Sequence, residues 1–86
     1  MDEYEVVLAR SARKELEALA DAIQDRVLAR LVSLTQNPRP TGCRKLAGAD
    51  SEWRLRVGDY RVLFSIDDST RVIDIVAIRH RREAYR

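Results

Sequence analysis

Two strand-like runs joined by a two-residue turn constrain this chain more than any other feature. Residues 53–57 alternate apolar and cationic side chains, and residues 60–66 follow with apolar side chains at every second position. Gly58-Asp59 between the runs is typical of a hairpin turn. Because successive side chains of a strand point to opposite faces, this pattern predicts a hairpin with one apolar face and one cationic face.

The first half of the chain predicts two amphipathic helices. Ser11 can cap a helix that runs to about Ala20, and Asp21 with Gln24 three residues on resembles the capping box of a second helix. The apolar stripes are Ala12, Leu16 and Leu19 in the first helix, and Ile23, Val27, Leu31 and Leu34, with Leu28 beside them, in the second. Helices joined this closely are expected to form an antiparallel hairpin.

The remaining elements complete an α+β domain over residues 1–86. A short strand is expected at residues 4–8, a loop from the Asn37-Pro38 break to about Ser51, and a last strand over residues 71–79. The order is β-α-α-β-β-β, with the helical hairpin packed on an antiparallel sheet. We expect Trp53, Leu55 and Val57 to pack under the helices.

The charge of the chain is unevenly distributed. Residues 1–43 hold six basic and seven acidic residues, a net charge of −1, whereas residues 44–86 hold ten and seven, a net charge of +3. Of the 16 basic residues all but Lys14 and Lys45 are arginine. The planar guanidinium suits phosphate binding and base stacking better than an ammonium group does, so the composition favours a nucleic-acid partner.

Cys43 is the only cysteine, so no internal disulfide can form, and a lone thiol is typical of the reducing cytoplasm. We expect it to be a passive thiol. No signal peptide and no apolar run of about 20 residues is visible. A single histidine and a single cysteine predict no metal-ligand cluster, and no cofactor is expected.

A cationic groove is predicted on the open face of the sheet. Arg54, Arg56 and Arg61 share that face by strand periodicity, and Arg79 and Arg81 approach it from the end of the last strand. The alternative is a solvated sheet face, with the arginines paired to the aspartates of the second half. Two side chains of the C-terminal segment, His80 and Tyr85, can also move protons.

Five segments together resemble the RelE/ParE superfamily of bacterial toxins: residues 37–39, 45–48, 53–64, 67–68 and 78–85. The resemblance covers essentially the whole chain. It is closer to the RelE branch, because the basic residues and the terminal tyrosine of that branch are present. The paired Arg54 and Arg56 stand where the best-studied branch has lysines, and the tail lacks the extra C-terminal helix of some members.

The resemblance implies a toxin that cleaves messenger RNA in the ribosomal A site without a metal ion, held inactive by a RelB-like antitoxin in a complex that we expect to be a higher oligomer. The site residues that it implies are Arg54, Arg56, Arg61, Arg81 and Tyr85, with His80 at the basic position that precedes Arg81. Further RNA contacts are expected from Arg44, Lys45, Arg79, Arg82 and Arg86.

The implied reaction is attack of the RNA 2′-OH on the adjacent phosphate. Tyr85 is the expected general base, because surrounding guanidiniums favour the phenolate. Arg61 and Arg81 would stabilise the transition-state charge, and Arg54 or Arg56 would orient the phosphate. His80 is the alternative for either proton-transfer role.

Two other functions share the same fold. One is a ParE-like toxin that inhibits DNA gyrase, and the other is an inactive homologue that only binds an antitoxin. The terminal Arg-His-Arg-Arg-Glu-Ala-Tyr sequence favours the nuclease.

Overall fold

The computed structural model describes residues 3–46, 52–80 and 82. Their elements follow the order β1 (Glu5–Leu8), α1 (Arg10–Glu17), α2 (Asp21–Leu34), β2 (Cys43–Lys45), β3 (Glu52–Val57), β4 (Tyr60–Asp67) and β5 (Val72–His80). Five strands form one sheet in the order β1-β5-β4-β3-β2. All neighbours are antiparallel except β1, which runs parallel to β5.

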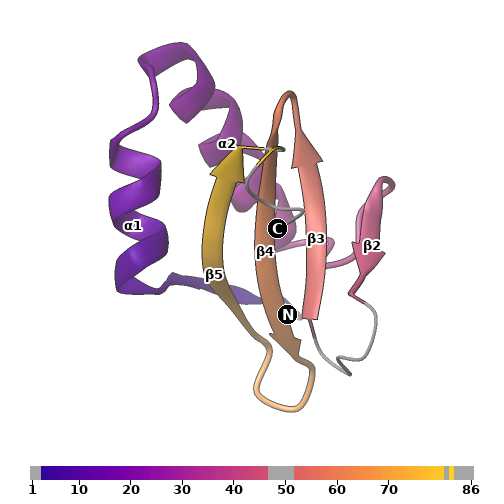
Figure 1. Ribbon diagram of the computed structural model, residues 1–86. Coiled ribbons are helices and arrows are strands. Elements are labelled where there is room, and N and C mark those ends of the chain that lie inside the picture. Colours follow the sequence, from indigo (N-terminus) through magenta and orange to yellow (C-terminus); the bar gives the residue numbers. More distant parts are fainter. Residues whose placement is uncertain (1–2, 47–51, 81, 83–86) are drawn as a thin grey trace.

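The predicted α+β architecture is confirmed, with two helices on a mostly antiparallel sheet. In Figure 1, α2 lies behind the sheet, and α1 runs beside β5 in the opposite direction to α2. One face of the sheet is thereby covered, and the other remains open. The strand β2 is an addition to the prediction, because three residues within a polar, Gly- and Pro-containing stretch are too few to show periodicity.

The core lies between the helices and the covered face of the sheet. Leu55 and Val57 are buried as predicted, whereas Trp53 is half-buried and packs at the rim of the core. The helices contribute Ala12, Leu16, Val27, Leu31 and Leu34, and the strands add Val62, Phe64, Ile66, Ile73, Ile75 and Ile78. The predicted helix stripes are confirmed apart from two residues: α1 ends at Glu17, so Leu19 packs against the core from beyond the helix, and Leu28 is 40% exposed.

The turn between β3 and β4 sets the register of the hairpin. Gly58 has φ +60° and Asp59 does not have a positive φ, the pattern of a type II′ turn, which favours glycine at its first central position. The resulting register places Arg56 opposite Arg61 and Leu55 opposite Val62. Cationic and apolar side chains are thus sorted to opposite faces, as the alternation predicted.

A bulge in β5 changes which residues face the core. Ala77 pairs with Leu63 and Ile75 pairs with Phe64, so Val76 has no partner on β4. Strict alternation from Ile75 would put residue 79 on the covered face. The extra residue reverses this, and Arg79 instead shares the open face with Arg61.

Both predicted helix caps are wrong. The residue before α1 is Ala9, the residue before α2 is Ala20, and neither helix has a side-chain cap. Ser11 lies inside α1, where its hydroxyl donates to the carbonyl of Val76 at 3.4 Å. Gln24 donates instead to the carbonyl of Leu16 at 2.9 Å and so ties α2 to the end of α1.

The helix α1 takes over the edge of β5 where β1 ends. The amide of Ala9 donates to the carbonyl of Ile75 at 2.9 Å. Six residues further along, Glu15 accepts the amide of Ile78 at 2.9 Å through Oε1 and binds Arg79 Nε at 2.6 Å through Oε2. The backbone of Ala9, just before α1, and the side chain of Glu15 on α1 therefore satisfy an edge that would otherwise be open to pairing.

Truncation of Phe64, which is 1% exposed, tests the position of the core. We expect Phe64→Ala to lower the free energy of unfolding by roughly 3–5 kcal/mol, because it leaves a cavity among packed side chains. Urea denaturation followed by circular dichroism measures this loss. Leu63→Ala is the neighbouring control on the open face, and a loss as large as that of Phe64→Ala would contradict the assignment of the two faces.

Candidate functional site

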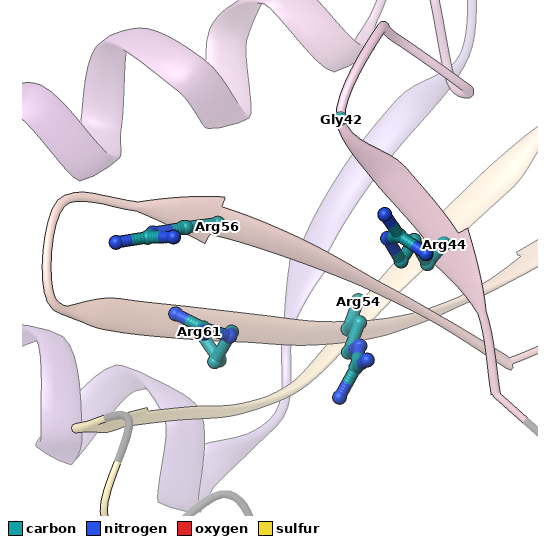
Figure 2. Close-up of a pocket in the computed structure, with 5 residues that line it drawn as sticks. All are labelled: Gly42, Arg44, Arg54, Arg56 and Arg61. Atoms are coloured by element: carbon teal, nitrogen blue, oxygen red, sulfur yellow. The ribbon is translucent and has the colours of Figure 1, made fainter.

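A pocket of about 410 Å³ opens on the uncovered face of the sheet. The described residues that line it are Gly42, Arg44, Arg54, Arg56 and Arg61. They come from the start of β2, from β3 and from β4, three neighbouring strands of the sheet. Figure 2 shows the four arginine side chains around this space, with Arg56 lying along β3 toward the hairpin turn.

The strand register brings these like charges together. Arg44 lies opposite Arg54 across β2 and β3, and Arg56 lies opposite Arg61 across β3 and β4. Cross-strand pairs of like charge destabilise a sheet, and no carboxylate is among the described lining residues. A bound anion would offset this repulsion, so the pocket has the chemistry of a phosphate site.

Arg61 is the most enclosed of the four. Its side chain belongs to the open face, yet the residue is only 8% exposed. Its Nη1 donates to the carbonyl of Tyr60 at 3.5 Å. A guanidinium held at low exposure loses little side-chain entropy on binding a ligand, and its charge is screened less than that of a surface residue.

The C-terminal residues that the sequence placed near this site separate in the structure. Arg79 is on the face of Arg61, but its Nε is bound to Glu15 and it does not line the pocket. His80 pairs with Tyr60 on the covered face, where the two rings meet edge to face with centroids 5.3 Å apart. Arg82 donates its amide to His80 Nδ1 at 3.4 Å. Arg81, Tyr85 and Arg86 lie outside the described residues.

Lys45 also lies apart from the pocket. It is opposite Trp53 and therefore shares the covered face, whereas its neighbour Arg44 points to the open one. Of the predicted RNA contacts in this segment, the structure brings only Arg44 together with the arginines of β3 and β4.

A group of side chains that we call the Arg39 clasp holds the loop before the pocket. Arg39 binds both carboxylate oxygens of Asp68, at 2.8 and 3.3 Å, and its guanidinium lies 5.2 Å from the ring centroid of Trp53. Tyr4 donates its hydroxyl to Asp68 at 2.6 Å. The clasp ties the start of the chain, the loop before β2 and the β4–β5 turn together, and so positions Gly42 and the strand β2, which carries Arg44.

No local pattern in the sequence predicts this clasp, since its members are separated by up to 64 positions. The sequence predicts the aspartates of the second half, Asp67 and Asp68 among them, only as general partners for the arginines. In the structure Asp67 accepts the hydroxyl of Ser69 at 2.6 Å within its own turn. The specific partner of Asp68 is Arg39, from the loop before β2.

Cys43 is half-buried and packs against the core. Burial raises the pKa of its thiol, only partly offset by the charge of Arg39. A protonated thiol is a weaker nucleophile than a thiolate, so the expectation of a passive cysteine agrees with this environment.

Within residues 3–46, 52–80 and 82, no group of three His, Cys, Asp or Glu side chains could hold a metal ion. No helix in those ranges is long and apolar enough to cross a membrane.

The fold and the sequence both match known toxins. The model of the family described as the ParE toxin of type II toxin–antitoxin system, parDE, matches residues 6–85. The RelE–RelB complex from Pyrococcus horikoshii contains a chain that is 31% identical, with 94% of this chain and 97% of that chain covered at a TM-score of 0.83.

Two further solved structures show the same fold. A chain of the RelBE2 toxin–antitoxin complex from Mycobacterium tuberculosis is 26% identical, with 91% of this chain and 98% of that chain covered at a TM-score of 0.80. The isolated E. coli RelE toxin is 20% identical, with 95% of each chain covered at a TM-score of 0.79. A search of curated protein sequences gave no match.

These similarities define the class of protein to which the sheet and its arginine pocket belong: the small toxins of type II toxin–antitoxin systems. Within that class, the chain belongs to the RelE/ParE superfamily, as the resemblance in its sequence predicted.

The Arg39 clasp makes stability depend on acid pH. The hydrogen bonds from Arg39 and then Tyr4 hold the pKa of the Asp68 carboxyl below its usual range. Since the folded pKa is depressed, the contribution is fully present above the ordinary aspartate pKa of about 3.9 and is lost as pH falls through the lowered value. Asp68→Asn should therefore flatten the decrease in thermal midpoint on acidification below about pH 4.

A double-mutant cycle isolates this interaction from other carboxylates. Arg39→Gln should remove the part of the pH dependence that Asp68→Asn removes, and the double variant should lose little more than either single variant. Thermal denaturation at several pH values measures all four proteins. Additive losses from the two substitutions would mean that Arg39 and Asp68 act independently.

Proposed function

We propose that this toxin is a ribosome-dependent endoribonuclease that cleaves messenger RNA and thereby inhibits translation. The observation that carries the proposal is the four-arginine pocket on the open face, with Arg61 nearly buried at its wall. Guanidinium groups bind phosphate oxygens in bidentate geometry and stack on unpaired bases. The pocket therefore fits a phosphodiester with its flanking nucleotides.

The reaction is transesterification within the RNA. The 2′-oxygen loses its proton to a general base and attacks the adjacent phosphorus, while the bond to the 5′-oxygen breaks and that oxygen takes up a proton. The products are a 2′,3′-cyclic phosphate and a free 5′-hydroxyl. Negative charge develops on the phosphate oxygens in the transition state, where fixed cationic donors are most effective.

The residues take the following roles in the proposal. Arg61 stabilises the developing charge because its position is fixed, and Arg54 and Arg56 orient the phosphate from the neighbouring strand. Tyr85 acts as the general base and Arg81 adds positive charge. Both are assigned from the family motif, because they lie outside the described residues.

His80 has no proton-transfer role in this proposal, because its ring packs on Tyr60 at the covered face. Arg44 contacts the RNA directly from the pocket. Lys45, Arg79, Arg82 and Arg86 are proposed to attract RNA from outside the pocket, and Arg79 does so while paired with Glu15.

Dependence on the ribosome follows from the small number of acid–base groups. A positioned acid or base contributes about 10²–10⁴-fold to the rate. Alignment of the 2′-oxygen with the leaving oxygen contributes more, and the ribosome, which holds the message in a defined path, can supply it.

The antitoxin partner is proposed to be RelB-like. The matched structures from P. horikoshii and M. tuberculosis are complexes of toxin and antitoxin. We propose a similar antitoxin for this chain, in a complex of higher order, located in the cytoplasm where its target is made.

Inhibition of DNA gyrase is the second candidate, favoured by the ParE description of the matching family model. Two assays separate the candidates. The nuclease cuts messages on translating ribosomes, which primer extension detects. A gyrase inhibitor leaves messages intact and blocks DNA supercoiling.

Substitution of Arg61 tests the charge-stabilising role. We expect Arg61→Gln to lower the single-turnover rate of cleavage on programmed ribosomes by about 10²–10³-fold, as removal of one transition-state donor does in other enzymes. Circular dichroism and urea unfolding establish that the variant is folded. Arg13→Gln is the matched control, an exposed arginine of α1 that is not part of the arginine pocket, and should retain full activity. A wild-type rate from folded Arg61→Gln would remove Arg61 from the mechanism.

Substitution of Tyr85 tests the general base. Tyr85→Phe removes one hydroxyl and keeps the ring, so we expect the cleavage rate to fall by about 10²–10⁴-fold with the stability unchanged. The rate of Tyr85→Phe should also lose the wild-type increase with pH. If folded Tyr85→Phe cleaves at the wild-type rate, the base is another group.

A further inference from the structure

A second cationic pocket lies at the tip of the β3–β4 hairpin, next to α2. Its volume is about 290 Å³, and it is lined by Arg26, Ala29, Arg30, Arg56, Val57 and Gly58. Arg56 also lines the arginine pocket of the open face. One guanidinium therefore belongs to both sites, and the cationic surface passes around the hairpin tip from the sheet to the helix.

Two arginines converge on the turn that forms this tip. Arg56 Nε donates to the carbonyl of Gly58 at 3.1 Å. On the Cα side of the same glycine, the guanidinium of Arg26 lies so close that an added Cβ would be 3.4 Å from its Nη1. The turn thus holds a guanidinium from the sheet and a guanidinium from the helix in one place.

The charges of this second pocket are not neutralised by the described part of the chain. No ion pair with Arg26, Arg30 or Arg56 occurs among those residues, although Asp59 follows Gly58 in the turn. Arg26 and Arg30 are one helical turn apart on α2, a spacing at which like charges destabilise a helix. An external anion that bridges them would offset that cost.

We propose that this second pocket binds the RNA backbone one or more phosphates away from the site of cleavage, so that the substrate path continues from the open face around the hairpin tip onto α2. The inference rests on the proposed function, since the first pocket must hold RNA for the path to begin there. RNA is favoured over an acidic protein because Arg56 lines both pockets, so that the second pocket continues the cationic surface proposed to hold the phosphodiester. The groove between β1 and α2 is instead lined mostly by apolar side chains, among them Leu28 and the 67%-exposed Val32.

Binding of non-cleavable RNA tests the path without any need for catalysis. The probes are fluorescent 2′-O-methyl RNAs of 2 and 12 nucleotides, titrated with the full chain in 50–200 mM salt and followed by anisotropy. The test variant is the double Arg26→Ala/Arg30→Ala. The charge-matched control is Arg10→Ala/Arg13→Ala on α1, which lies in neither pocket.

For the 12-nucleotide RNA, the test variant should lose about tenfold in affinity at low salt. The slope of log K against log salt should fall by about 1.4, since each phosphate contact to a single strand contributes about 0.7. The control should keep the wild-type slope, and the 2-nucleotide RNA, whose single phosphodiester cannot occupy both pockets at once, should bind both variants alike. Arg26→Lys/Arg30→Lys should retain most of the slope because it keeps the charge.

Three results would overturn the inference. One is an unchanged slope in the test variant, and another is an equal loss in the control, which would indicate only bulk charge. The third is that the double substitution weakens binding of a 12-residue polyglutamate peptide but not binding of the RNA. That result would assign the surface at Arg26 and Arg30 to an acidic polypeptide. Absence of cleavage on ribosomes with length-dependent RNA binding intact would overturn the proposed cleavage, whereas the RNA path, which needs only RNA in the first pocket, would still hold.

Discussion

The register of the β3–β4 hairpin is the constraint on which the rest of this structure depends. A glycine at φ +60° allows a two-residue turn, and the turn fixes Arg56 opposite Arg61 and Leu55 opposite Val62. A shift by one residue would exchange the two faces of each strand, exposing the core and burying the arginines. The hydrophobic core and the arginine pocket are therefore consequences of the same pairing. On either side of the hairpin, β5 pairs with β4 and β2 pairs with β3, and these strands extend both faces of the sheet.

The clustered arginines of the pocket lower the stability of the fold, and contacts elsewhere in the molecule offset this loss. Like-charged arginines face one another across three strands, and Arg61 is nearly buried among them. Against this, α1 closes the free edge of β5 through Glu15, and the Arg39 clasp fixes the loop that leads to Arg44. Clusters of unfavourable charge held by a well-packed frame are typical of sites that bind an anion.

This arrangement suits the proposed function, in which the ribosome presents the RNA substrate to the pocket. A small domain has room for one core and one binding face, and here the sheet provides both. The arginine pocket and the second pocket at the hairpin tip share Arg56 and so form one cationic surface. On the far side of α2, the apolar groove beside β1 is chemically separate from this surface.

The amino-acid sequence by itself determined the order of the two helices and of four of the five strands, most of the helix stripes and the sorting of Arg54, Arg56 and Arg61 to one face, because strand and helix periodicity are local properties. Only the tertiary structure decided what depends on distant contacts. The bulge at Val76 placed Arg79 on the open face, where Glu15 binds it, and put His80 against Tyr60. The parallel pairing of β1 with β5, the short β2 and the Arg39–Asp68 contact likewise join residues far apart in the chain. Such contacts are selected by the packing of the whole domain, and no local pattern in the sequence specifies them.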